Sequence, residues 1–598
     1  MLKEMSATTM DDLASRMQRQ PFSLATDGSN EKEKKYNPIV ITIAGSDGLI
    51  APELLALPGL PQFSAHSRFS LFWLYVSFYI GKNIFDIMAR ELKVHNIPWG
   101  NCVAFACDNA NVMTGRHSGV YSFVAAENSQ VHLANCCLHL VHIAAKKGAE
   151  VLPAFSDVLV DVFFYFQKSA NRQQELENLK DLYDIKAGKV LKHVCTRWLS
   201  IGRCLQRLIA LWQPLQHFFR DEKEKENKKT GAQSKKAEVQ TKKAEAQTKK
   251  TEVQSRKSVS SGEHSKAQSK TSEVQGSSSS SYSRTKVANV YDFLKSPTNL
   301  LYGHFLVYTL KVFDPVLLQL QAEQPMIHKL RDYLCQLIRD IYARFCLPSS
   351  LQGKEVDQVQ YKDRGQQKAD EDLLIGMEAK KMLLNAKEHH LRDCRVKDFY
   401  ADVRLYFETV VEYLLKKLPL ENSVLKNAIV IDPHRQMEVR ISQLEYFLLQ
   451  FPVLLPKDVP MDEILEQFSR YQAADIKPIL DEAKQEEDKQ SESSWKKAQD
   501  VRVDALWNMI ISSFPDLLDL ARVMKGIMTI PHSSAPCERV FSKVKKNVTD
   551  QRSCLSQETT EALLVLKSQP RGVVAGNFEI KDSELQALKS AYRLSKGT

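Results

Sequence analysis

Hydrophobic positions in the first 150 residues change repeatedly between short, β-branched runs and longer amphipathic stretches. The short runs are typical of strands, and the longer stretches place apolar residues at helical intervals. This alternation predicts an α/β unit. The predicted strands are 22–26, 38–45, 101–108 and a short one near 131–136, and the predicted helices are 82–95, 112–127 and 138–149.

Beyond residue 150 almost every apolar stretch has helical spacing, with charged residues on the opposite face. We therefore predict a second, all-helical part that follows and interrupts the α/β unit. Its predicted helices are 153–168, 172–187, 200–220, 301–322, 325–346 and 401–418, with polar loops at 350–368 and 484–498 and a last helical block at 501–568 that is broken near Pro531.

The segment 227–286 has a different composition. It holds 14 Lys and Arg against 5 Asp and Glu, so it carries +9 of the net charge of +10. Its heptads KKAEVQT, KKAEAQT and KKTEVQS offer only Val and Ala as apolar residues, too little for a coiled-coil seam. We predict a solvated linker, and the basic excess does not by itself indicate a folded nucleic-acid surface.

Other features limit the class of protein. The N-terminal stretch 1–20 reads as a polar helix without the apolar centre of a signal peptide, and the eleven cysteines form no secreted-type framework. The aromatic run Phe69–Ile80 has twelve residues, too few to cross a bilayer. We predict an intracellular chain with no membrane segment. The region 61–80 is interpreted either as a native buried element or as a foreign insertion.

Two aspartates stand where predicted strands end, Asp27 in SLATDGSN and Asp108 in FACDNANVMTG. A side chain at such a position is held rigidly and still faces a cleft. Paired carboxylates with a third acid can hold two divalent ions that activate water and stabilise the leaving oxygen of a phosphodiester. The alternative for each aspartate is a simple turn former.

Three segments, in chain order, closely resemble the hAT superfamily of cut-and-paste DNA transposases: PFSLATDGS, NIPWGNCVAFACDNANVMTG and PHSSAPCERVFSKVKKNVTDQRSCLSQETTEALLVL. The resemblance implies an RNase H-like mixed-sheet core interrupted by a long helical insertion domain. It also implies that Asp27, Asp108 and Glu538 form a catalytic acidic triad. The expected cofactor is Mg²⁺ or Mn²⁺, because both prefer hard oxygen ligands.

Two further motifs resemble DNA-positioning motifs of that superfamily. Cys136 and His139 lie in CCLHLVH, and Arg197 and Trp198 lie in CTRWLS. The resemblance implies that Trp198 stacks beside a base rotated out of the duplex, where base stacking is worth about 1–3 kcal/mol. The alternatives are a zinc site at the Cys-x-x-His spacing and a tryptophan that packs in the core.

The C-terminal pattern places Leu563, Leu564 and Leu566 on a helix that starts near Ser556. In the superfamily this segment buries an apolar surface between subunits, so we expect a homodimer or a higher oligomer. Packing of the same helix against the α/β core is the alternative, and the two are compatible.

The expected domains are 1–20, an N-terminal polar helix; 21–220, the first part of the catalytic domain; 221–289, the linker; 290–500, the helical insertion; 501–570, the end of the core with the dimerisation region; and 571–598, a tail. No Cys/His set for the superfamily's BED-type zinc finger precedes the first strand. We expect either a nuclear, DNA-binding transposase or a domesticated or decayed one that acts as a non-catalytic interaction protein. An unrelated helical scaffold is the third alternative.

Overall fold

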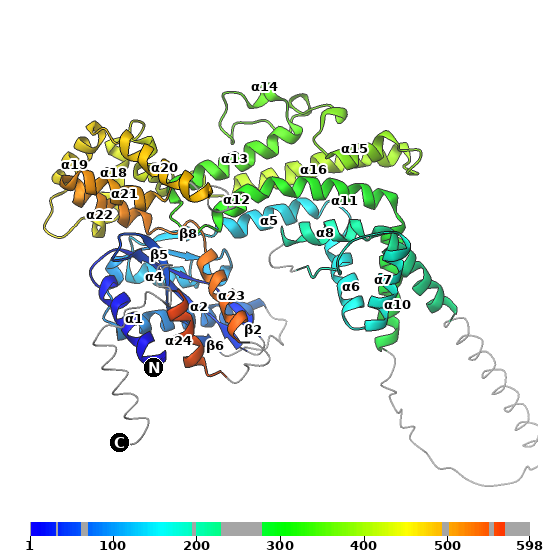
Figure 1. Ribbon diagram of the computed structural model, residues 1–598, viewed down its shortest axis with the longest axis horizontal. Coiled ribbons are helices and arrows are strands. Elements are labelled where there is room, and N and C mark those ends of the chain that lie inside the picture. Colours follow the sequence, from blue (N-terminus) through cyan, green and yellow to red (C-terminus); the bar gives the residue numbers. More distant parts are fainter. Residues whose placement is uncertain are drawn as a thin grey trace, which may run out of the picture.

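The computed structural model describes residues 2–31, 34–60, 70–193, 199–228, 278–492, 501–548 and 555–568. Its described part comprises a layered α/β unit and a large helical body (Figure 1). Most of the predicted linker, the whole predicted tail, and Arg197 and Trp198 lie outside the described residues.

The α/β unit is built on a five-stranded mixed sheet with the order β5-β4-β1-β7-β8. The antiparallel pairs are β1 with β4 and β4 with β5, and the parallel pairs are β1 with β7 and β7 with β8. Every residue of β1 and β7 is buried, as expected for central strands covered on both faces. The strands are β1 (Phe22–Thr26), β4 (Ile39–Ala44), β5 (Ile50–Ala56), β7 (Cys102–Cys107) and β8 (His132–Asn135), and a small second sheet holds β2 (Ser29–Glu31), β3 (Lys34–Tyr36) and β6 (Gly59–Leu60).

The two faces of the sheet are covered by helices from opposite ends of the chain (Figure 1). One face packs Phe22, Leu24 and Phe105 against α1 (Leu2–Met17), α2 (Ser70–Val94) and α4 (Val120–Glu127). The other face packs smaller residues against α23 (Ala535–Asn547) and α24 (Gln557–Ser568). The C-terminal helices are therefore an integral layer of the N-terminal unit.

Helix α24 also covers the free edge of strand β5. The Glu561 carboxylate accepts a hydrogen bond from the Leu57 N–H at 2.7 Å, and Ser568 Oγ accepts one from the Leu54 N–H at 3.3 Å. Helix α1 lies along the same helix, and Lys3 pairs with Glu558. Because an open edge strand is a template for pairing with another chain, this cover satisfies backbone groups and blocks that pairing.

The helical body begins with α5 (Cys137–Ala149), which leaves the sheet and packs along α16 (Asp393–Lys417) (Figure 1). Among the described residues, no helix combines the length and the apolar character needed to cross a bilayer. The other main helices are α6 (Phe155–Gln167), α7 (Ala170–Leu182), α8 (Ile201–Ala210), a helix over 212–228, α10 (Ser278–Lys295), α11 (Pro297–Leu310), α12 (Asp314–Leu320), α13 (Ile327–Phe345), α18 (Ile441–Gln450), α19 (Met461–Ala473), α20 (Lys477–Glu492), α21 (Val503–Ser513) and α22 (Leu518–Met528).

The predicted strands at 22–26, 38–45, 101–108 and near 131–136 are confirmed, and so is the N-terminal helix, as α1. Strand β5 was not predicted, because Pro52 interrupts its apolar pattern. An edge strand tolerates a proline that a central strand would not. The region 61–80 is helical from Ser70 onward, where α2 begins, and residues 61–69 lie outside the described residues.

Several predicted boundaries are also wrong. The predicted helix 112–127 breaks into α3 (Asn111–Thr114) and α4, because Gly115 and Gly119 approach each other too closely for a Cβ. The predicted linker boundary at 289 falls inside α10, whose residues Val287, Val290 and Leu294 are buried in the helical core. The predicted loop 484–498 is helical up to 492, since its Glu, Lys and Gln residues are good helix formers.

Candidate active site

A row of three alanines crosses the centre of the sheet. Ala25 of β1 is in register with Ala106 of β7, and Ala106 is in register with Ala134 of β8. All three are buried in one cluster with Cys537 and Phe541 of α23. Because alanine side chains are small, α23 can pack close to the sheet, and it lies directly over the carboxyl ends of these strands.

Asp27 and Asp108 follow adjacent parallel strands, each two residues beyond a paired alanine. Successive side chains of a strand alternate between faces, so both aspartates continue on the face that α23 covers. Asp27 Oδ1 accepts a hydrogen bond from the Gly28 N–H at 2.7 Å, and Asp108 Oδ1 accepts one from the Ala110 N–H at 3.1 Å. Both side chains are half-buried.

Glu538 lies in the first turn of α23, next to the fully buried Cys537. Burial raises the pKa of the Cys537 thiol well above its ordinary value, and the charges of Asp27, Cys136 and Glu538 raise it further. Burial likewise raises the pKa of Cys107, with added effects of Asp108, Cys136 and Asp27. Asp27 therefore acts on both thiols, that of Cys107 before Asp108 and that of Cys537 before Glu538. We call the ends of β1 and β7 together with the start of α23 the carboxylate corner.

The donor chemistry of this corner suits a hard divalent cation, because three carboxylates supply only oxygen ligands. In the described part of the chain, however, no three His, Cys, Asp or Glu side chains are gathered closely enough to hold a metal ion. The start of α23 thus lies over the ends of β1 and β7, but the side chains of Asp27, Asp108 and Glu538 are not gathered around a single point.

Cys136 and His139 lie at the start of α5, beside this corner. Cys136 is buried, and its Sγ accepts a hydrogen bond from Ser534 Oγ at 3.0 Å. Burial raises the pKa of this thiol, so it remains protonated at neutral pH. His139 is half-buried one turn further along the helix. In this structure Cys136 connects α5 to the loop that precedes α23.

That loop is also tied to the end of α12. Ser533 Oγ donates a hydrogen bond to the Leu320 carbonyl at 2.6 Å, and Arg539 Nη1 donates one to the Gln321 carbonyl at 2.9 Å. Arg539 Nε also lies 3.5 Å from a Glu323 carboxylate oxygen. These contacts fix the start of α23, and therefore Glu538, against the helical body.

The sequence analysis did not identify these anchoring residues. A pair of serines before a helix signals a local cap. Ser533 instead bonds a carbonyl 213 residues upstream, and Ser534 bonds a sulfur 398 residues upstream. No local pattern carries such information.

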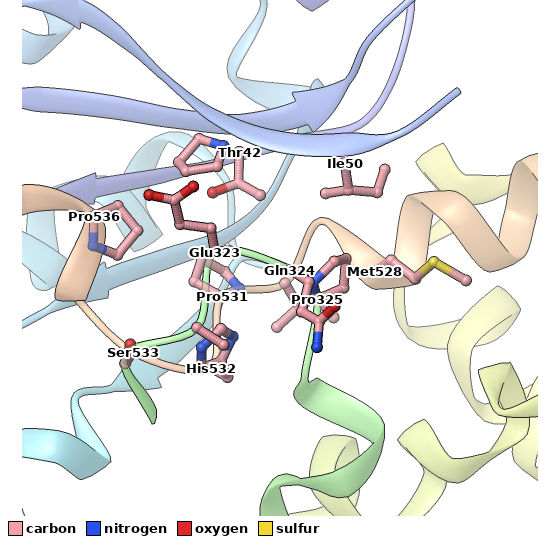
Figure 2. Close-up of a pocket in the computed structure, with 13 residues that line it drawn as sticks. Thr42, Ile50, Glu323, Gln324, Pro325, Met528, Pro531, His532, Ser533 and Pro536 are labelled. Atoms are coloured by element: carbon pink, nitrogen blue, oxygen red, sulfur yellow. The ribbon is translucent and has the colours of Figure 1, made fainter. Parts of the chain in front are cut away.

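A small pocket lies beside the anchored loop (Figure 2). Thr42 and Ile50 line it from the sheet, Glu323 from the segment after α12, and Pro531 and His532 from the loop. Burial lowers the pKa of His532 to about 4, so its ring is neutral at physiological pH. Its Nε2 has no hydrogen-bond partner among the described residues.

Arg197 and Trp198 cannot be placed relative to the corner, because 194–198 lie outside the described residues. The residue that follows them is placed. The Leu199 N–H donates a hydrogen bond to His142 Nδ1 on α5 at 3.2 Å. His142 lies one turn beyond His139. Leu199, which directly follows the Arg-Trp motif, therefore contacts the helix that starts at the carboxylate corner.

Helices α21 to α24 and most of α20 form one continuous stretch of sequence that ends at the sheet. Residues 480–570 match the hAT family C-terminal dimerisation region. The match includes Glu538 and begins inside the helical domain predicted for 290–500. It supports hAT family membership and self-association of the chain.

The hAT dimerisation region is largely packed within its own chain. Leu564 is 1% exposed in the cluster beneath the sheet, so the alternative of intramolecular packing holds for this side chain. Leu563 and Leu566 are half-buried. Of the region's described large apolar residues, Leu518 is the exposed one.

Proposed function

We propose that this chain is a hAT transposase-like protein that cleaves DNA phosphodiesters and transfers strands at Asp27, Asp108 and Glu538. The observation that carries the proposal is that Asp27 and Asp108 follow adjacent parallel strands on the face covered by α23, which carries Glu538 in its first turn. The mixed sheet supports an RNase H-like core. The match to the hAT dimerisation region adds an independent indication of the same ancestry.

A bound Mg²⁺ or Mn²⁺ would supply the charge that activates the attacking oxygen and stabilises the leaving one. The chain supplies the frame for that chemistry. Asp27 and Asp108 are held by adjacent central strands, and Glu538 is held above them by α23. Water would attack phosphorus and release a 3′ hydroxyl, and that hydroxyl would then attack a second phosphodiester.

Nicking of supercoiled plasmid by the purified full chain tests the proposal. We expect nicking with Mg²⁺ or Mn²⁺ and its loss, at least about 100-fold in rate, in Asp108→Asn, because electrostatic groups at such sites are worth about 10²–10³. The control is Glu412→Gln, an exposed carboxylate paired only with Lys362, which should nick like the wild type. Equal rates for Asp108→Asn and the wild type would refute the assignment.

A second candidate function is a non-catalytic, self-associating protein derived from a transposase. It is favoured by the family match, because the matched region, residues 480–570, is a dimerisation region. Light scattering of the full chain at micromolar concentration tests this function independently of catalysis. A dimer without metal-dependent nicking would support it, and a monomer would refute the self-association role in both functions.

A further inference from the structure

Residues 185–193, with the sequence IKAGKVLKH, form a segment without helix or strand that connects α7 to the Arg-Trp motif. We call it the basic segment. Its lysines, Lys186, Lys189 and Lys192, recur at every third position and are all exposed. The three side chains form no ion pair within the described part of the chain. The segment therefore presents a regular series of cations along one stretch of backbone.

The basic segment is fixed to the helical body. Its apolar residues Ile185, Ala187 and Val190 pack against the main hydrophobic core. Arg207 of α8 donates a hydrogen bond to the Lys189 carbonyl at 2.9 Å. A Cβ at Gly188 would lie 2.4 Å from Arg207 Nη1, so glycine is what permits this contact. The backbone that carries the lysines is thus preorganised.

The charge around the segment is predominantly positive. Arg203 of α8 is exposed on the same helix face as Arg207, one turn before it. The nearest acidic residues in sequence are Asp181 and Asp184, which both precede the first lysine. The three lysines of the basic segment and the two arginines of α8 outnumber these two aspartates.

The segment also leads toward the carboxylate corner. His193 at its end is buried, and its Nδ1 lies 3.4 Å from Ser200 Oγ. The neighbouring Leu199 bonds His142 of α5. Helix α5 begins directly after Cys136, and burial and, to a smaller extent, the charge of Glu538 raise the pKa of the Cys136 thiol. The end of the basic segment is therefore linked through Ser200 and Leu199 to the helix that begins at the carboxylate corner.

We propose that the basic segment binds the phosphate backbone of duplex DNA as it leaves the carboxylate corner. This inference rests on the proposed function and adds the surface that holds the uncut part of the substrate. A chain spans at most about 3.3–3.6 Å per residue, so Lys186 to Lys192 covers at most roughly 20 Å. That length corresponds to about six nucleotides of one strand along the duplex axis. Exposed lysines contact phosphates without reading sequence, so the contact is sequence-independent.

The test compares two triple variants of the full chain. The first is Lys186→Gln with Lys189→Gln and Lys192→Gln. The matched control is Lys397→Gln with Lys457→Gln and Lys477→Gln, three exposed lysines elsewhere on the helical body. Binding of a fluorescent duplex is measured by anisotropy between about 50 and 200 mM NaCl. Urea midpoints verify that both variants fold like the wild type.

We expect the first variant to bind at least about tenfold more weakly at the lowest salt, and its plot of log K against log salt to be flatter by about 2–3, because each phosphate contact contributes about 0.9. The control should stay within about twofold of the wild type. Equal affinity and slope for the two variants would overturn the inference while leaving the proposed function intact. A wild-type chain that neither binds duplex nor nicks plasmid would overturn both, whereas a wild-type chain that nicks plasmid without measurable duplex binding would overturn the inference alone.

Discussion

Ser534 donates a hydrogen bond to the Sγ of Cys136 at 3.0 Å, although 398 residues separate the two in the chain. Both side chains are buried. The contact joins the start of α5 to the loop before α23, and these are the two elements that bring the Cys-x-x-His motif and Glu538 to the carboxylate corner. The proposed catalytic arrangement, which is drawn from both ends of the chain, therefore depends on a contact between two neutral side chains.

Replacing Ser534 by alanine should weaken this junction. A net hydrogen bond contributes about 0.5–1.5 kcal/mol, so we expect Ser534→Ala to lower the free energy of unfolding by about 1 kcal/mol in urea titrations. The control is Ser512→Ala, whose exposed hydroxyl bonds only the Asn508 carbonyl of its own helix. If the two variants lose the same stability, the contact with Cys136 makes no specific contribution.

The ion pair of Arg16 and Glu53 holds α1 on the sheet. Arg16 Nη1 and Nη2 each donate to a Glu53 carboxylate oxygen at 2.8 Å, and the Glu53 side chain is 2% exposed. Removing one partner of a buried pair leaves an uncompensated charge, which costs about 3–5 kcal/mol. We expect Glu53→Gln to lose about 3 kcal/mol of unfolding free energy, at the lower end because the amide keeps one hydrogen bond.

Asp12 supplies the control for that prediction. It is the exposed partner of the same guanidinium, at 3.0 Å and four residues earlier on α1. Exposed pairs at this spacing are worth about 0.3–0.5 kcal/mol, so Asp12→Asn should change stability only slightly. Comparable losses in Asp12→Asn and Glu53→Gln would show that burial of the pair is unimportant.

The pKa of Glu561, on the helix that covers β5, makes the stability of the protein depend on pH. Burial raises the pKa of this carboxyl above its ordinary value of 4.5, despite the hydrogen bond from Leu57, and Glu91 and Glu558 raise it further. The folded state then holds the proton of Glu561 more tightly than the unfolded state does. The contribution of Glu561 to stability is therefore greatest at acid pH and falls as pH rises through the folded pKa. Glu561→Gln keeps an acceptor for Leu57 and should lack this decline in urea midpoints measured from pH 4.5 to neutrality.

Glu558 is exposed on the same helix, and its pKa is shifted in the opposite direction. A hydrogen bond from Lys3 lowers the pKa of this carboxyl, so its contribution is lost as pH falls. Glu558→Gln should therefore keep the decline toward neutral pH, moved slightly to lower pH because the charge of Glu558 raises the pKa of Glu561. A decline that persists in Glu561→Gln and disappears in Glu558→Gln would contradict the assignment to Glu561.

Local pattern was sufficient for the central strands and for the aspartates that follow them. β1 and β7 are short, apolar and buried on both faces, so composition alone marks them, and Asp27 and Asp108 stand where the apolar runs stop. Pattern was insufficient where the local signal is weak or misleading. Strand β5 carries a proline, and α10 begins in a low-complexity serine run before its buried stripe appears.

The sequence by itself determined the α/β character of the first part, the helical character of the remainder and the strand-end positions of Asp27 and Asp108, because these depend on residue type and on periodicity within a few positions. Glu538 became a candidate only through the resemblance to the hAT superfamily. Only the tertiary structure decided that α23 lies on the alanine row, that α24 covers the β5 edge and that Ser533, Ser534 and Arg539 fix Glu538 against the helical body. Each of these contacts joins residues more than 200 positions apart. Such contacts are set by the packing of whole layers, and periodicity along the chain does not encode them.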